Sequence, residues 1–323
     1  MPAEPLNIPV IAGPTAGGKT ELAIAIAERL DGKAEAISAD AYAIYRRLDI
    51  GTAKPSLAER AHLPHRLVDV VEPTDAFTVH DWLNAANAAV TDIRAHNRLP
   101  IVVGGTHLYI KAFLEGLFEG PGVDEALRAD LFALDPAERR AELERVDPEA
   151  AARIHANDIR RTVRALEVYR LTGTTITAHQ QQWDKDATRR TDATLVILDW
   201  PTDEINRRIN ARVKAMFERG LVDEVRALWQ TDQLGTQAIE ALGYKQLVAV
   251  FRAEQSGKLT QRKLDAALAE AQERIKIETR RFAKNQRTWL RRLAPGATVL
   301  RPAETPIGEM ADAVLQAARN AQA

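Results

Sequence analysis

The feature that most constrains the fold is a glycine-rich segment near the N-terminus. The sequence GPTAGGKT, residues 13–20, has the spacing glycine, four residues, glycine, lysine and threonine, which is typical of a phosphate-binding loop. The apolar run IPVIAG precedes it, and alanines and leucines at helical spacing follow it over residues 21–30. A strand, a tight loop and a helix in this order present backbone amides and a helix N-terminus to an anion. The segment therefore predicts a phosphate site at the end of a buried strand.

Strand-like and helix-like segments alternate along the chain after this loop. Further strands are expected at residues 34–40, 65–73, 101–103 and 194–200. Helices are expected over residues 79–98, 107–117, 202–229 and 261–292. Such alternation is typical of a parallel sheet that is covered by helices on both faces. The predicted fold class is therefore α/β, a phosphate-loop (P-loop) parallel sheet flanked by helices.

A linker interrupts this pattern at Gly120, Pro121 and Gly122. From Asp124 to about Gly173 the sequence is helical and contains no convincing buried strand. We therefore expect residues 120–193 to form an inserted helical domain. Residues 1–119 and 194–323 are then expected to form the P-loop catalytic core.

Composition narrows the class of protein. The chain has no cysteine, which excludes a disulfide framework, a thiol nucleophile and a cysteine-based zinc site. No apolar run approaches the roughly 20 residues that a membrane span needs, and the N-terminus lacks a signal-like segment. We therefore expect a cytoplasmic protein that does not contact a membrane.

Basic residues are concentrated in two places, although the formal net charge is only -1. Residues 274–292 contain eight basic residues and one acid, and residues 160–164 read RRTVR. Two basic islands on a neutral chain can bind a nucleic acid locally. Composition alone, however, favours solvent-exposed helix faces over a nucleic-acid site.

Phosphate loops are commonest in nucleotide kinases and NTPases, where the lysine contacts phosphate oxygens and the threonine contacts Mg²⁺. Such enzymes normally need a carboxylate at the end of a neighbouring strand, yet the clearest strand ends in Gly104, Gly105 and Thr106. Other candidate carboxylates near strand ends are Asp69, Glu72 and Asp199. A small-molecule kinase and an RNA-binding NTPase therefore stay open.

Asp40 is the last residue of the segment 34–40 that is expected to form a strand. At the edge of the sheet beside the phosphate loop, its carboxylate could act as a general base, a magnesium ligand or a helix cap. Position alone favours the helix cap among these three roles.

Several ordered motifs of the chain resemble those of the tRNA dimethylallyltransferase family, also called tRNA isopentenyltransferases. They are GPTAGGKT, ISAD with DIGTAKP, PHRLVDVVEP, VVGGTHLYIKAFLEG, RIHANDIRRTVRALEVYRLTG, ALGYKQL and RFAKNQRTWLRR, and they cover most of residues 8–293. The family usually has serine at the positions of Gly17 and Ala41. These two departures leave Lys19, Thr20 and Asp40 intact.

The resemblance implies an enzyme that moves a dimethylallyl group from dimethylallyl diphosphate to N6 of the adenosine 3′-adjacent to the anticodon in tRNA, releasing diphosphate. By this resemblance Asp40 accepts the amine proton, Thr106 orients the reactants, and Lys19 and Arg212 stabilise the diphosphate. The implied diphosphate contacts are Gly13, Thr15, Ala16, Gly17, Gly18, Lys19 and Thr20, with Thr20 also holding Mg²⁺.

The resemblance also implies which residues contact RNA. They are Asp40, Ala41, Tyr42, Ala43, Thr106, Arg128, Arg160, Arg161, Thr162, Val163, Arg164, Glu240, Ala241, Leu242, Gly243, Tyr244 and Lys245. The inserted domain would clasp the anticodon stem-loop, and the enzyme would act as a monomer. A prenyltransferase of free adenylate is a further alternative, but a nucleotide alone needs no such clasp.

Overall fold

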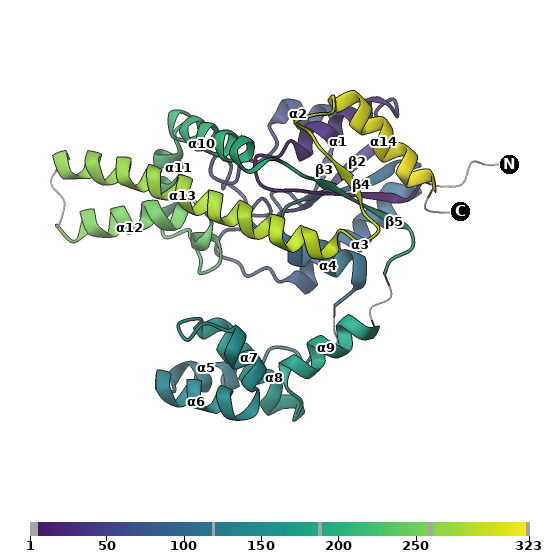
Figure 1. The fold of residues 1–323 in the computed structure, drawn as a ribbon. Helices are drawn as coiled ribbons and strands as arrows, with labels where there is room; N and C mark the ends of the chain where they lie inside the picture. Colours follow the sequence, from purple (N-terminus) through teal and green to yellow (C-terminus); the bar gives the residue numbers. More distant parts are fainter. Residues whose placement is uncertain (1–5, 118–119, 187–188, 258–260, 321–323) are drawn as a thin grey trace. The chain divides into compact units, whose positions relative to one another are not determined.

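The computed structural model describes residues 6–117, 120–186, 189–257 and 261–320. Its centre is a sheet of six parallel strands in the order β3-β2-β4-β1-β5-β6 (Figure 1). The strands are β1 (Ile8–Ala12), β2 (Ala34–Ala39), β3 (His65–Arg66), β4 (Leu99–Gly104), β5 (Ala193–Leu198) and β6 (Thr298–Leu300). The first strand along the chain is central, so the loop that follows it lies in the middle of one sheet edge.

Helices cover both faces of this sheet, as the sequence predicts. Helices α1 (Lys19–Glu28) and α14 (Ile307–Asn320) pack on one face, and α3 (Val79–Ala95) and α4 (His107–Glu115) pack on the other (Figure 1). Successive residues of β1 point to opposite faces, because Val10 packs with Trp82 of α3 whereas Ile11 packs with Leu22 of α1. The α/β prediction is therefore confirmed.

The strand expected over residues 65–73 is wrong beyond its first two residues. Leu67 and Asp69 have φ angles of 59° and 58°, in the left-handed region, so the chain turns out of the sheet after Arg66. The following residues bond to the segment after β2 instead, since the amides of Val70 and Val71 both donate to the carbonyl of Ile44.

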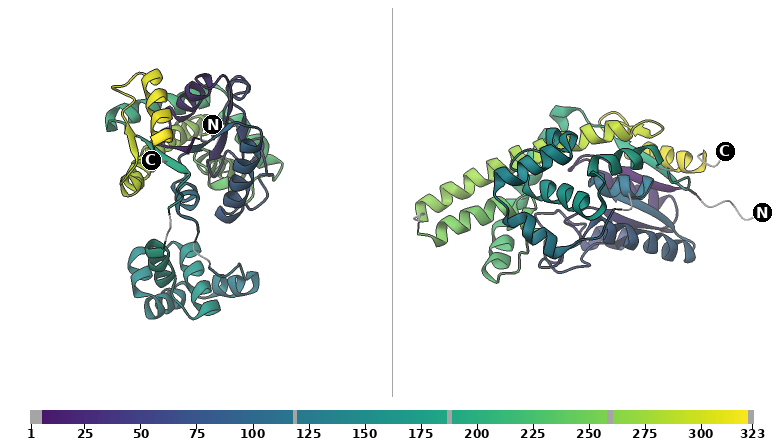
Figure 2. Two further views of the ribbon diagram at one scale, coloured as in Figure 1. Left: turned by 90° about the vertical axis from the view of Figure 1, so that its right-hand side faces the viewer. Right: turned by 90° about the horizontal axis from the view of Figure 1, so that it is seen from below.

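A second group of helices extends beyond the sheet. It consists of α10 (Thr202–Glu218), α11 (Leu221–Gln230), α12 (Tyr244–Gln255), α13 (Gln261–Leu293) and the short 3₁₀ helix η1 (Ala238–Glu240), while α2 (Leu57–His62) precedes β3. The expected helix over residues 202–229 is divided at Gly220, whose φ of 94° a helix cannot accommodate. Helices α12 and α13 lie side by side (Figures 1 and 2). In the described part of the chain no helix is long and apolar enough to cross a membrane.

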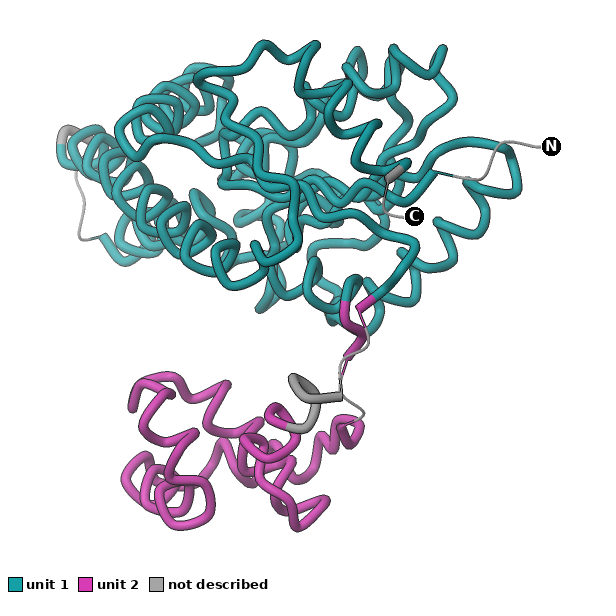
Figure 3. The backbone as a smooth tube through the Cα atoms, turned by 45° about the vertical axis from the view of Figure 1, so that its right-hand side comes forward, with its two compact units in different colours: residues 1–114, 190–323 teal, residues 115–189 magenta. Residues whose placement is uncertain are grey.

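The chain divides into two compact units (Figure 3). The first comprises residues 1–114 and 190–323, and the second comprises residues 115–189, compared with the 120–193 expected from the sequence. The second unit contains α5 (Glu125–Ala133), α6 (Pro136–Val146), α7 (Pro148–Arg153), α8 (Ile159–Thr172) and α9 (Ile176–Asp186). Leu131, Leu143, Val163 and Leu166 form its own apolar core.

Candidate active site

Residues 13–20 form a tight loop between β1 and α1, and the helix begins at Lys19 rather than at Glu21. Three side chains from distant parts of the sequence hold this loop. Trp200 Nε1 donates to the carbonyl of Gly17 over 2.9 Å, Arg208 Nε donates to that of Ala16 over 2.7 Å, and Gln286 Oε1 accepts from the amide of Thr15 over 2.9 Å. Ala16 has a φ of 60°, which is costly for a residue with a Cβ. These contacts stabilise the loop in a conformation that it would not favour alone.

Lys19 lies inside the loop and donates through Nζ to the carbonyls of Pro14 and Gly13, over 2.8 and 3.2 Å. Burial and, to a smaller extent, the nearby charge of Arg212 together lower the pKa of Lys19 to about 8, although Asp40 and Glu21 oppose the change. Burial also lowers the pKa of Arg212. Two cations held close together out of water attract an anion strongly.

Two cavities share Lys19, Thr20 and Arg212 as lining residues. The smaller, of about 350 Å³, is lined by residues 16–21 together with Arg208, Ala211 and Arg212. The larger, of about 680 Å³, includes Asp40 and Thr106 in its lining. Lys19 and Arg212 therefore line two sites. The smaller cavity is enclosed by the loop, the start of α1 and α10. The larger cavity lies at the carboxyl edge of the sheet.

Asp40 and Thr106 are linked at this edge. The Thr106 hydroxyl accepts from the amide of Ala41 over 3.0 Å, and the Thr106 amide donates to the carbonyl of Ala39 over 3.1 Å. Asp40 Oδ1 accepts from the amides of Tyr42 and Ala43, over 2.9 and 3.2 Å. Asp40 therefore caps the turn after β2 and also lines the larger cavity.

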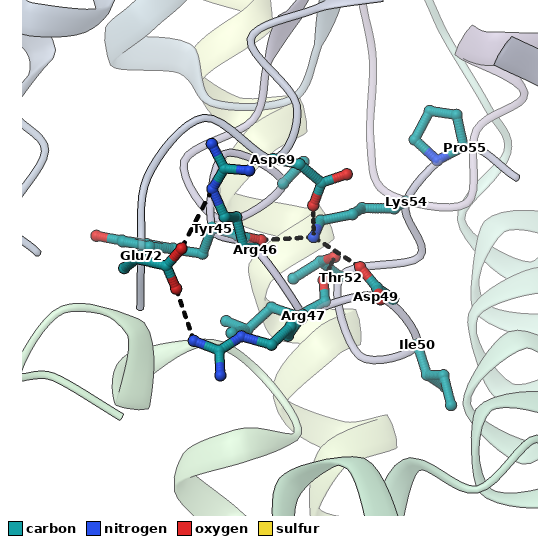
Figure 4. Close-up of polar contacts among 12 residues, drawn as sticks. Tyr45, Arg46, Arg47, Asp49, Ile50, Thr52, Lys54, Pro55, Asp69 and Glu72 are labelled. Atoms are coloured by element: carbon teal, nitrogen blue, oxygen red, sulfur yellow. Dashed lines mark hydrogen bonds and ion pairs between the residues drawn. The ribbon is translucent and has the colours of Figure 1, made fainter. Parts of the chain in front are cut away.

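The three carboxylates considered for an NTPase lie elsewhere. Asp69 pairs with Arg60. Asp69 also pairs with Lys54, and Glu72 pairs with Arg46 and Arg47 (Figure 4). Neither Asp69, Glu72 nor Asp199 lines either cavity. Among the described residues no group of three or more histidine, cysteine, aspartate or glutamate side chains is placed to hold a metal ion.

The pairs in Figure 4 differ greatly in burial. The Lys54 side chain is 3% exposed and donates to Asp69, Asp49 and the carbonyl of Tyr45, whereas Arg46 and Glu72 are about half exposed. Replacing Lys54 by methionine is expected to lower the free energy of unfolding by about 2–3 kcal/mol, because Asp69 loses a partner in a partly buried place.

Urea denaturation of the Lys54→Met variant measures this loss. The matched control is Arg46→Met, which breaks an exposed pair and is expected to cost less than about 1 kcal/mol. Equal losses in the two variants would show that the Lys54 network stabilises the fold no more than the exposed pair of Arg46 and Glu72 does.

The segment at residues 240–245, which is expected to contact RNA, lies at the larger cavity. Glu240, Ala241, Leu242, Gly243 and Lys245 line it, as do Ala41, Tyr42 and Ala43. Tyr244 does not line it, because its ring is fully buried and its hydroxyl donates to Glu224. The basic helix α13 contributes Arg281, Phe282 and Asn285 to the lining.

The remaining predicted RNA contacts lie in the second unit. In residues 160–164 the side chains of Thr162 and Val163 are buried, whereas Arg160 and Arg161 are exposed. Arg164 and Arg128 both pair with Glu167, a fully buried carboxylate, over 2.6 and 2.9 Å. The structure therefore brings Arg128 and Arg164 together around an internal acid.

The fold and site together define a phosphate-loop enzyme in which partly buried cations face a cavity with an acid at its wall. The chain belongs to the IPP transferase family, whose sequence model matches residues 43–293. It is a prenyltransferase, and a nucleotide kinase or hydrolase is not favoured.

Individual relatives agree with this assignment. A tRNA dimethylallyltransferase from Anaeromyxobacter dehalogenans (strain 2CP-C) is 43% identical over 294 residues, which cover 89% of this chain and 92% of that protein. The crystal structure of the full-length tRNA isopentenylpyrophosphate transferase from Bacillus halodurans has a TM-score of 0.69 and 32% identity, and the match covers 98% of each chain. A eukaryotic dimethylallyltransferase captured acting on tRNA has a TM-score of 0.74 and 26% identity, covering 92% of this chain and 74% of that one.

Proposed function

We propose that this protein transfers a dimethylallyl group from dimethylallyl diphosphate to N6 of the adenosine 3′-adjacent to the anticodon in tRNA. The observation that carries the proposal is the position of Lys19 and Arg212, which line both cavities, near an acid, Asp40, that lines only the larger one. A diphosphate and a nucleophile can then approach the same point from two sides. The names of the relatives support tRNA as the acceptor and a dimethylallyl group as the group that is transferred.

The reaction breaks the bond between the allylic carbon and the diphosphate oxygen and forms a bond from that carbon to N6. Lys19, Arg212 and the amides of residues 18–20, which line the smaller cavity, stabilise the negative charge that grows on the leaving diphosphate. N6 loses one proton, which Asp40 accepts. Thr106 holds the Ala41 amide, so it fixes the turn that carries Asp40.

Mg²⁺ is the expected cofactor, and the hydroxyl of Thr20 is the group that would hold it. This hydroxyl belongs to a residue that lines both cavities, and it has no hydrogen-bond partner among the described residues. Because the described acids form no metal cluster, the other ligands would be diphosphate oxygens and water, as is usual for Mg²⁺. When bound, the ion would neutralise part of the charge of the diphosphate.

RNA binding is assigned to two regions. Residues 40–43 and 240–245 would receive an adenine that is flipped out of the loop, and the exposed Arg160 and Arg161 would contact phosphates of the anticodon stem-loop. We further propose that the second unit clasps this stem-loop, and that the enzyme acts as a monomer in the cytoplasm.

One assay tests the proposed function. The protein is incubated with dimethylallyl diphosphate, Mg²⁺ and unmodified tRNA, and the digested tRNA is analysed by mass spectrometry. We expect a prenylated adenosine in the anticodon loop and released diphosphate. Phosphate transfer from ATP would instead indicate a kinase, RNA-stimulated ATP hydrolysis an NTPase, and modification of free adenylate alone a nucleotide prenyltransferase.

Affinity for tRNA is expected to fall as salt rises, because contacts to phosphates release counterions. Replacing both Arg160 and Arg161 by alanine should reduce the slope of log affinity against log salt by up to about 2, since each phosphate contact contributes about 0.7–0.9. Arg164 is kept, because its removal would leave the buried Glu167 with one partner fewer. Filter binding over a salt series, with Arg319→Ala as the control, measures the slope. An unchanged slope would make the two arginines ordinary surface residues.

A further inference from the structure

The turn at residues 49–51 is held by one carboxylate from a distant helix. Glu224 of α11 accepts from the amides of Asp49 and Ile50 through Oε2, over 3.0 and 2.7 Å, and from the amide of Gly51 through Oε1, over 3.1 Å. The hydroxyl of Tyr244 donates to the same Oε1. Four donors therefore converge on one side chain, which lines neither of the two cavities described above.

This arrangement determines the conformation of the turn. Three consecutive amides that point at one anion form a concave backbone site, and hydrogen bonds to a charged acceptor are stronger than neutral ones. Gly51 also lies directly against Tyr244, because a Cβ at this position would be 2.4 Å from Cε2 of the ring. The position of the turn thus depends on both Glu224 and Tyr244.

The other end of the same segment is fixed separately. Lys54 donates to Asp49 and to the carbonyl of Tyr45, so residues 49–54 are held by Lys54 as well as by α11 (Figure 4). Residues 51–55 line the larger cavity. The carbonyl of Thr52 accepts from Nη2 of Arg212 over 3.4 Å. A shift of the turn would therefore move the wall of the cavity and a partner of the diphosphate-binding arginine.

We propose that Glu224 is a positioning residue for the transfer reaction. Through the turn at residues 49–51 it sets the cavity wall and Arg212, and through Tyr244 it sets the RNA-contacting segment at residues 240–245. Glu224 thus links the parts of the protein that bind the two substrates. The inference rests on the proposed function for its effect on rate, whereas its effect on the turn is independent of that function.

The test compares Glu224→Gln with the control Asp223→Asn, which changes the neighbouring, exposed acid. Glutamine replaces one carboxylate oxygen by an NH2 group, which cannot accept a hydrogen bond. The variant therefore loses the hydrogen bonds of at least one oxygen, either those from Asp49 and Ile50 or those from Gly51 and Tyr244. With both substrates saturating, we expect kcat of Glu224→Gln to fall by about 10–100-fold, because small misplacements of reacting groups reduce rates by about this much. We expect Asp223→Asn to keep the parent kcat.

Hydrogen exchange of the substrate-free protein gives a readout that does not depend on the reaction. The amides of Asp49, Ile50 and Gly51 should exchange faster in Glu224→Gln and at the parent rate in Asp223→Asn. This measurement decides whether Glu224 holds the turn even if the parent protein proves to catalyse a different reaction.

A milder variant, Tyr244→Phe, removes the link to residues 240–245 but keeps the three amide contacts. It should raise KM for tRNA more than it lowers kcat, whereas Glu224→Gln is expected to lower kcat strongly. Unchanged exchange at residues 49–51, or a parent kcat in Glu224→Gln, would overturn the proposal. So would a Tyr244→Phe variant with the parent KM for tRNA.

Discussion

Replacing Asp40 by asparagine is expected to slow transfer by about 10²–10⁴ when both substrates are saturating, because the adenine amine loses its proton acceptor. Asparagine is the sharpest change at this position. Its side-chain oxygen can still accept from the amides of Tyr42 and Ala43, so the cap of the turn after β2 is retained. Only the basicity of the group is removed. Single-turnover kinetics measure the chemical step separately from substrate binding.

Two controls separate the base from the cap. Thermal unfolding of Asp40→Asn should match that of the parent, whereas Asp40→Ala, which lacks the capping oxygen, is expected to lose about 1 kcal/mol of stability. Binding of tRNA to Asp40→Asn is measured as well, since Asp40 lines the cavity proposed for the adenine. A parent rate of transfer in Asp40→Asn would assign this residue to capping alone.

Three parts of the candidate site that could be predicted from the sequence follow strands. Residues 13–20 follow β1, Asp40 follows β2, and Thr106 lies just beyond β4. Parallel strands bring their carboxyl ends to one edge of the sheet, so recognising the strands was enough to place these groups together. Their convergence on one cavity, and the line of contacts from Ala39 to Thr106 and Ala41, agree with that reasoning.

The side chains that hold the site in place could not be predicted in this way. Gln286 contacts the phosphate loop from a position 271 residues later in the chain, and Trp200 and Glu224 contact their loops across more than 170 residues. A single glutamine in a basic helix, or a glutamate in the first turn of α11, carries no local pattern that distinguishes it from a surface residue. Their roles depend on how α11 and α13 pack against the sheet.

Local conformation was also decisive where the predicted elements were wrong. The third strand ends early because Asp69 turns toward Lys54 and Arg60, an interaction stronger than the β propensity of the valines that follow. Likewise, the apolar periodicity of residues 202–229 fits one long helix, and only Gly220 signals that the helix is divided. A tertiary contact of Asp69 thus determines where the third strand ends, and the backbone angle of Gly220 determines where the helix is divided.

Replacing Lys19 by alanine is expected to lower kcat/KM for dimethylallyl diphosphate by about 10²–10³, because a buried cation that stabilises the leaving group in the ground state and the transition state is lost. Binding of tRNA should persist, since the residues proposed to contact RNA keep their positions. Steady-state kinetics at limiting donor, with tRNA binding as the control, measure both quantities. Parent kcat/KM in this variant would show that residues 13–20 do not bind the diphosphate.

The pH dependence of the parent enzyme tests the same lysine without a change of volume. Because the pKa of Lys19 is lowered to about 8, the ammonium is present below pH 8 and lost as the pH rises above it. The donor is an anion and needs this charge, so kcat/KM for the donor should fall above pH 8. Bound diphosphate favours the charged form, and the fall in kcat is therefore expected at higher pH. In Lys19→Arg, whose side chain stays protonated, the fall near pH 8 should disappear; if it persisted, another group would be responsible for it.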